Sequence, residues 1–139
     1  MQLNFQSKRP LIDIFSYLSD MDKFVKVHPV IYKINTIGDN KYKAYETLKM
    51  GFLPITFNYS FTVEADPNTN AILIRATVMK LTTIEMTFTL SHQEGLTDIV
   101  ETIQFRSVLP VKSIMRKVFR KQHRLLFENI EKATYQPIS

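Results

Sequence analysis

The sequence predicts an α+β fold, in which a curved seven-stranded antiparallel sheet wraps around a long C-terminal helix and two short helices lie between strands one and two. Three observations lead to this prediction. Apolar and polar residues alternate along segments between residues 30 and 108, as in strands with one buried and one solvated face. Short connections separate these segments, so each strand should reverse the one before it. Residues 110–133 then repeat apolar side chains at helical spacing.

The N-terminal third should hold one strand and the two short helices. We expect the strand over residues 2–7, followed by a helix that Ser7 caps and whose first turn contains Pro10. A second helix should run from Asp20 to Val25. It should end before Pro29, because the residue preceding a proline disfavours the helical conformation.

The six strands that follow differ in how clearly they show an inward face. Segments 55–63 and 84–90 alternate strictly, so their large apolar residues should point inward. Segment 71–79 is apolar on both sides, which leaves its inward face ambiguous.

The connections between the strands are of two kinds. Three consist of polar turn formers and lie at residues 38–40, 66–70 and 93–95. The connections between these polar ones, and the exit from the last strand, are apolar. Since successive turns of a meander fall at opposite ends of the sheet, the apolar connections should gather at one end. An exposed apolar group of this size is typical of a binding mouth, a membrane contact or an interface. The expected mouth residues are Met50, Phe52, Leu53, Met79, Leu81, Val108 and Leu109.

The C-terminal helix is expected to be strongly amphipathic. At 100° per residue from Lys112, its basic residues spread over about 0–180° and its apolar residues over about 200–340°. The apolar arc should cover the concave face of the sheet, which leaves His123 and Phe127 on the outer side. The basic arc consists of Lys112, Arg116, Lys117, Arg120, Lys121 and Arg124.

Composition narrows the function further. The 139 residues favour one domain, residues 1–139, and the absence of cysteine excludes disulfides and thiolate chemistry. The net charge of +5 comes from the basic helix, and few aromatic residues interleave with it, so nucleic-acid binding is not expected. His28, His92 and His123 lack metal-ligand spacing, and we expect no metal and no cofactor. The pattern is that of a cytoplasmic, bacterial-type protein whose basic helix is a solvated face or contacts an anionic membrane.

The order of elements resembles the helix-grip fold of the START/polyketide-cyclase/birch-allergen-like (SRPBCC) superfamily. Within it, the chain is similar to small bacterial polyketide cyclase/dehydrase or coenzyme-Q-binding proteins. The resemblance covers essentially the whole chain and rests on residues 24–29 (FVKVHP), 42–48 and 125–130. It implies a START-like domain with a cavity between sheet and helix for a lipid, sterol, quinone or polyketide. Some members are enzymes and many only bind, and no catalytic residues carry over.

The residues expected inside are mostly large and apolar, with four polar groups among them. Glu46, Glu101, Gln122 and Asn129 should face inward, where an unpaired carboxylate is costly. They either orient the polar head of a ligand, or lie at a bulge or solvated rim, or satisfy backbone groups. The expected lining of the cavity, or of a fully packed core, is Tyr42, Glu46, Phe57, Tyr59, Phe61, Met86, Phe88, Glu101, Ile103, Phe105, Val118, Gln122, Leu125 and Asn129.

Three functions fit this interior. The first is binding or transport of an apolar or amphipathic small molecule. The second is a cyclase or dehydratase that uses Glu46 or Glu101 as acid and base. The third is a module with a packed interior that docks a protein or membrane through its apolar end or basic helix.

Overall fold

The computed structural model describes residues 1–50 and 52–133, with Met50 described by its backbone alone. The described residues form one seven-stranded antiparallel sheet of order β1-β7-β6-β5-β4-β3-β2, two short helices after the first strand and a long helix at the end. The predicted helix-grip architecture is therefore confirmed. In chain order the elements are β1 (Gln2–Ser7), α1 (Leu11–Ser19), α2 (Met21–Val27), β2 (Ile31–Gly38), β3 (Lys41–Met50), β4 (Leu53–Asp66), β5 (Ala71–Val78), β6 (Thr82–Gln93), β7 (Leu96–Ser107) and α3 (Lys112–Lys132).

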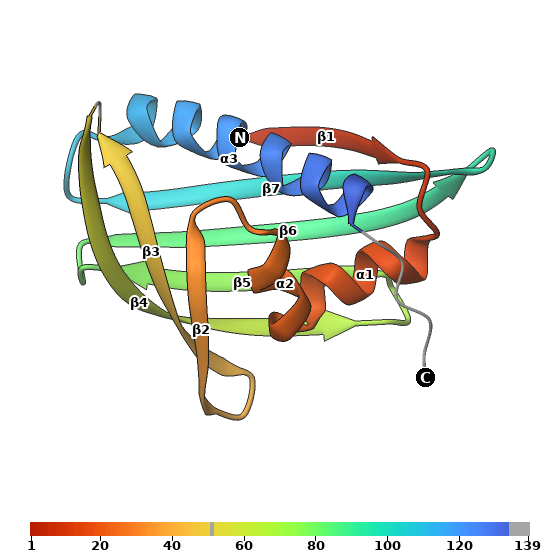
Figure 1. Cartoon of the computed structure of the whole chain (residues 1–139), viewed down its shortest axis with the longest axis horizontal. Coiled ribbons are helices and arrows are strands. Elements are labelled where there is room, and N and C mark those ends of the chain that lie inside the picture. Colours follow the sequence, from red (N-terminus) through yellow and green to blue (C-terminus); the bar gives the residue numbers. More distant parts are fainter. Residues whose placement is uncertain (51, 134–139) are drawn as a thin grey trace.

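The sheet curves around its helices; strands β2 to β7 follow each other as a meander, and β1 pairs with β7 at the edge (Figure 1). The long helix α3 lies along β1 and β7, while α1 packs against β4, β5 and β6. The face that α3 and α1 cover is the concave one, so the inward residues of β4, β5 and β6 meet helix side chains there.

Burial along β4 shows that the interior is tight at one end and open at the other. The exposed fraction falls from 59% at Leu53 to 5% at Phe61 and 4% at Val63. The ambiguous strand β5 turns Ile72 and Ile74 inward. The protein therefore has a packed core at the Val63 end and a looser interior toward Leu53.

The two short helices begin close to their predicted positions, but the residue predicted to cap the first one does not do so. Ser7 does not cap α1: Pro10 precedes the helix, and the Ser7 hydroxyl donates to Glu131 instead. Asp20 does cap α2, because its carboxylate accepts hydrogen bonds from two backbone N–H groups of the first turn. The second helix also continues to Val27, two residues beyond the predicted end.

The buried face of the C-terminal half of α3, from Gln122 on, is turned relative to the prediction, whereas the N-terminal half turns Met115, Val118 and Phe119 of the predicted arc inward. His123 and Phe127, expected on the outer side, are both buried, while Leu125 is only half-buried. The buried arc thus runs from about 280° through zero to about 60°, a rotation of roughly 80°. The physical reason is the position of the helix over the β1 edge: Phe127 packs its ring 4.4 Å from that of Phe5. The six basic residues remain exposed, as expected.

The two halves of α3 are held unequally. Near its C-terminus, Asn129 Nδ2 donates to the Val27 carbonyl oxygen at 2.8 Å, and the Glu131 carboxylate accepts from the Lys8 amide at 3.0 Å. Near its N-terminus, no side chain caps the helix and Ile114 is 52% exposed. The C-terminal half is therefore anchored to α2 and to the segment after β1, whereas the N-terminal half rests on apolar contacts.

The apolar connections gather at one end of the molecule. The β3–β4 and β5–β6 turns and the β7–α3 connection lie together on the left of Figure 1. A hydrogen bond of 3.3 Å from the Val108 amide to the Leu81 carbonyl joins two of them. The side chain of Met50 lies outside the described residues. We call the remaining exposed side chains here the apolar end: Phe52, Leu53, Met79, Leu81, Val108 and Leu109.

The β5–β6 turn has an unusual backbone. Met79 and Lys80 both adopt positive φ, at 54° and 59°, although neither is glycine or asparagine. Each such residue costs about 1 kcal/mol relative to an ordinary conformation. The turn with this strained backbone exposes the side chain of Met79 to solvent.

None of the described helices is both long enough and apolar enough to span a membrane.

Candidate functional site

A cavity of about 380 Å³ lies between the concave face of the sheet and α3. Its walls are the inward side chains of the central strands, the N-terminal half of α3 and the stretch where α2 leads into β2. Eight of the residues predicted to line it do so: Glu46, Phe57, Tyr59, Phe61, Met86, Phe88, Val118 and Gln122. Most other lining residues are apolar, and His28, Thr82 and His123 add polar groups.

The cavity opens at the apolar end. Met79 and Leu109 belong to both the apolar end and the lining, and the half-exposed Ile114 of α3 lies beside them. Phe52, which is 98% exposed, stands at the rim of this end without lining the cavity. Leu53, Leu81 and Val108 likewise lie outside the lining.

Six predicted lining residues lie elsewhere. Tyr42 lies beside Phe61 on the same face of the sheet and stacks against its ring at a centroid distance of 5.4 Å, so it packs against the core rather than the cavity. Ile103 is fully buried in a second cluster with Leu3 and Ile84, and Phe105 packs against Phe119 at 5.3 Å. The other three are Glu101, Leu125 and Asn129.

The reason for these last three positions is the rotation of α3. It moves Leu125 to the edge of the buried face and brings Asn129 to α2, where its amide satisfies a backbone carbonyl. It also brings His123 between Glu101 and the cavity.

Glu101 and His123 form a buried pair. Glu101 is completely buried on β7, and its two carboxylate oxygens lie 2.7 and 2.6 Å from His123 Nδ1. Aromatic rings pack around the imidazole, with the Phe119 ring at 5.3 Å and the Phe88 ring at 6.3 Å. A carboxylate in such surroundings requires a partner, and His123 supplies it. Glu101 therefore faces inward, as predicted, but meets the imidazole rather than the cavity.

Glu46 faces the cavity from β3 and is 8% exposed. Burial raises the pKa of its carboxyl group to about 7, because the charged form loses its hydration. When His123 is protonated, its charge acts in the opposite direction on this pKa, and so does a hydrogen bond from Tyr59. Burial and the neighbouring Glu46 also raise the pKa of the Tyr59 phenol. Near neutral pH the Glu46 carboxyl group thus exchanges between its acid and its carboxylate.

His28 is held as a neutral imidazole. Its Nδ1 accepts hydrogen bonds from the backbone amides of Val30 at 3.2 Å and Ile31 at 3.0 Å. Burial lowers the pKa of His28 to about 3, and His123 adds to this effect when it is protonated. Because Nδ1 accepts, the ring proton is on Nε2, on the edge that is free to face the cavity.

The two cavity histidines were missed by sequence reasoning. From the sequence, His28 is expected only to lack metal-ligand spacing, but it braces the start of β2 and also lines the cavity. His123 is expected on the outer side of the C-terminal helix. The signal that pointed to it was Glu101, an inward carboxylate without an assigned partner.

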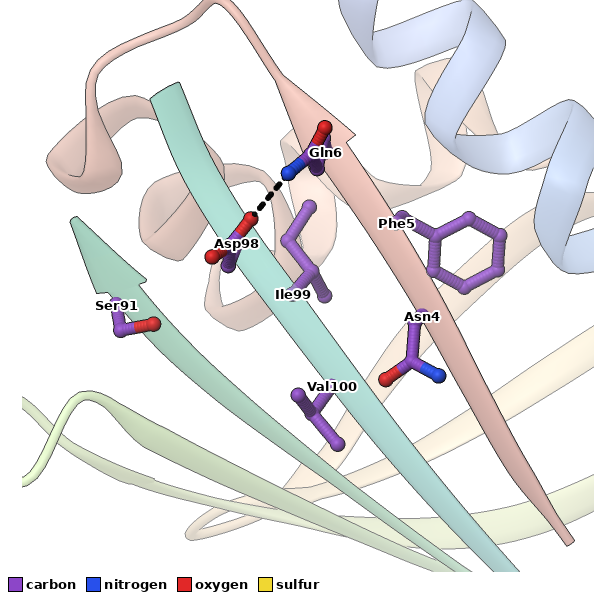
Figure 2. A pocket seen from close by; sticks show the side chains of 7 residues that line it. All are labelled: Asn4, Phe5, Gln6, Ser91, Asp98, Ile99 and Val100. Atoms are coloured by element: carbon purple, nitrogen blue, oxygen red, sulfur yellow. Dashed lines mark hydrogen bonds between the residues drawn. The ribbon is translucent and has the colours of Figure 1, made fainter. Parts of the chain in front are cut away.

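A second hollow lies on the outer face of β1, β7 and β6 (Figure 2). Asn4, Gln6 and Asp98 stand on this solvated side, where Gln6 Nε2 donates to Asp98 Oδ1 at 2.9 Å, while Phe5 points the other way, toward α3. The hollow is open to solvent and brings no buried titratable side chains together, since Asp98 is the one titratable residue of its lining. The candidate site is therefore the cavity beneath α3.

Within the described residues there is no group of three or more His, Asp or Glu side chains placed to hold a metal ion.

The seven-stranded antiparallel sheet, the two short helices and the long C-terminal helix together form the helix-grip fold. Solved structures share it across nearly the whole chain. A conserved protein from Geobacillus kaustophilus superposes with a TM-score of 0.78 at 16% identity, covering 94% of this chain and 91% of that one. Ara h 8.0201 gives a TM-score of 0.73 at 18% identity, with 94% and 93% covered. The Zhui aromatase/cyclase from Streptomyces sp. R1128 gives 0.74 at 11% identity, with 94% and 90% covered. No protein-family model and no curated protein sequence matches the chain.

Proposed function

We propose that the protein binds an apolar or amphipathic small molecule, such as a lipid, a quinone or a polyketide-like compound, in the cavity between the sheet and α3. The cavity itself is the observation that carries this proposal. Its volume of about 380 Å³ lies within the range of small-molecule sites, and its lining is mainly aromatic and aliphatic. Burial of apolar ligand surface contributes about 25 cal/mol per Å² before the costs of association.

The few polar groups of the lining would orient the ligand. Glu46, His28 and Gln122 come from three different elements and all face the cavity. An apolar body with one polar head matches this distribution, because most of the wall offers no hydrogen bonds.

Binding is testable by filling the cavity. Val118 lines it from α3, whereas its neighbour Lys117 is exposed. We expect Val118→Trp to weaken binding of the fluorescent probe 1-anilinonaphthalene-8-sulfonate about tenfold or more, since the indole takes up ligand space. Lys117→Trp is the matched control and should leave the affinity unchanged. Equal affinities in both variants would refute the proposed site. Native mass spectrometry of freshly purified protein identifies any ligand that remains bound.

A second candidate is an enzyme of the cyclase or dehydratase kind, for which Glu46 supplies the favouring observation. A buried carboxyl group with a pKa of about 7 can donate and accept protons near neutral pH. The Zhui aromatase/cyclase shares the fold. Turnover of an aromatic polyketide precursor that falls in Glu46→Gln, with unchanged binding, would support this function.

The apolar end also supports contact with an anionic membrane during ligand exchange. Lys80 and Lys112 are exposed beside the exposed residues Met79 and Leu109. Apolar side chains flanked by basic ones adsorb to anionic lipid, with about 1 kcal/mol for each basic residue near the surface.

The test is sedimentation with anionic and neutral vesicles. We expect the double variant Lys80→Glu and Lys112→Glu to lose most binding to anionic vesicles. Lys132→Glu, at the anchored end of α3, should retain it. Absence of wild-type binding to both kinds of vesicle would reject membrane contact.

A further inference from the structure

Resting on the proposed function, we propose that the cavity recognises a ligand with an acidic hydroxyl group, a phenol or an enol, and that His123 takes the proton of that group on binding. The ligand is then held as its oxyanion, beside the protonated His123 and the N–H group of His28. This assigns a proton acceptor, a hydrogen-bond donor and a chemical class of ligand to the polar part of the cavity.

The geometry of the Glu101–His123 pair carries the first step of the argument. Glu101 lies outside the cavity lining and occupies His123 Nδ1, at 2.6–2.7 Å. A carboxylate there accepts a hydrogen bond from Nδ1–H and fixes the tautomer, so that Nε2 carries the free lone pair. Among the described residues Nε2 has no hydrogen-bond partner, and His123 belongs to the lining. This arrangement of carboxylate, imidazole and open Nε2 is that of an oriented general base.

His28 supplies the second step. Its Nδ1 is committed to the backbone of Val30 and Ile31, so its Nε2–H is a donor of fixed orientation. A neutral imidazole can donate to an oxygen atom without bringing a competing charge. The two histidines thus combine a proton acceptor with a donor that stabilises the resulting anion.

The charges around His123 select the class of ligand. Glu101 from β7 and Glu46 from β3 are the acidic groups near it, and Tyr59 from β4 lies against Glu46. A ligand that arrives as a carboxylate would add a further negative charge to this buried group. A phenol or an enol arrives uncharged, and its negative charge forms only as His123 becomes positive.

The proton transfer balances within the complex. The O–H bond of the ligand breaks and an N–H bond forms at His123 Nε2. Glu101 keeps its negative charge and its hydrogen bond to Nδ1, so the products are a ligand oxyanion and an imidazolium ion between two negative groups. No oxidant, metal or further reactant takes part.

The probe 7-hydroxy-4-methylcoumarin tests the inference, because its phenolate absorbs at longer wavelength than its phenol. Its 7-methoxy analogue has the same apolar body but no acidic proton. At a pH about one unit below the pKa of the free probe, we expect the protein-bound probe to be mainly phenolate. We also expect the hydroxyl probe to bind about tenfold more tightly than the methoxy analogue, the usual gain from a charge-assisted hydrogen bond.

Two variants locate the effect. Glu101→Gln keeps the shape of the side chain but removes the charge that orients and supports His123, and it should restore the spectrum of the bound probe to that of the phenol. His123→Gln removes the proton acceptor and should do the same. Both variants should keep the far-ultraviolet circular dichroism spectrum of the wild type, which shows that they are folded.

The outcomes separate the inference from the proposed function. If both probes bind the wild type with equal affinity and the hydroxyl probe remains a phenol, the inference is wrong and the proposed function stands. If phenolate forms equally in the wild type and in both variants, His123 is not the acceptor and the inference is again wrong. If neither probe binds, both the inference and the proposed function fail.

Discussion

Glu46→Gln should change how the stability of the protein depends on pH. The glutamine keeps the size of the side chain and its ability to hydrogen-bond with Tyr59, but it cannot ionise. In the wild type, folding raises the pKa of this carboxyl group from 4.5 to about 7. Between these values the unfolded chain has already lost the proton that the folded protein retains. The free energy of unfolding must therefore fall as the pH rises through this window.

The size of the effect follows from the shift. A difference of about 2.5 pKa units, at 1.36 kcal/mol for each unit, corresponds to about 3 kcal/mol. Below pH 4.5 the wild type and Glu46→Gln should be equally stable, because both carry an uncharged side chain in both states. Above pH 7 the variant should be more stable by about 3 kcal/mol, since it buries no charge.

Urea unfolding of both proteins over a series of pH values measures this difference directly. Glu85→Gln is the matched control, because Glu85 lies on the outer face of the sheet and pairs with Arg75 in solvent at 3.2 Å. That control should show no comparable gain between pH 4.5 and 7. A stability difference between the wild type and Glu46→Gln that stays constant across this window would refute the reasoning, and would mean that Glu46 is solvated.

Three further predictions concern stability and use urea unfolding. Phe127→Ala should lower the free energy of unfolding by about 3 kcal/mol or more, because Phe127 is buried against Phe5. Phe52→Ala, at a fully exposed ring, should change it by less than about 0.5 kcal/mol. Equal losses in the two variants would contradict the rotated α3. Lys80→Gly should stabilise by about 1 kcal/mol because it relieves a positive φ, and a loss of stability would argue against this turn. Asn129→Ala should cost about 1–2 kcal/mol by leaving the Val27 carbonyl without its donor, and no cost would count against that anchor.

The fold could be predicted because its signals are local. Alternation along residues 55–63 and 84–90, turn formers between strands and a helical repeat after residue 110 each fix an element from nearby residues, and a meander leaves little freedom in their order. The same logic placed the apolar connections at one end. Ser7 failed as a cap because it ends β1 and the helix begins only at Leu11, and its hydroxyl group donates to the distant carboxylate of Glu131.

The polar part of the site could not be predicted, because tertiary contacts determine it. An apolar arc assigned from hydrophobicity alone excludes a histidine, yet His123 is buried because Glu101, 22 residues away in the sequence, needs a partner. Phe127 was isolated among polar residues on its arc and is buried because Phe5 lies opposite. His28 was visible as a residue before a proline, but its tautomer depends on the backbone that follows it.

The unequal attachment of α3 separates the free energy of opening the cavity from the free energy of global unfolding. In a uniformly packed protein the two would be coupled. A ligand can pass the apolar end if only the first turns of α3 lift, since the hydrogen bonds at Asn129 and Glu131 stay intact. Such a partial opening costs less than global unfolding, in line with the hierarchy of local openings seen in native proteins. Substitutions near Ile114 can then change the rate of ligand exchange with little effect on the equilibrium stability, which depends on the anchored C-terminal half of α3. If the protein binds a ligand as proposed, the ligand would exchange quickly while the free energy of global unfolding stayed high.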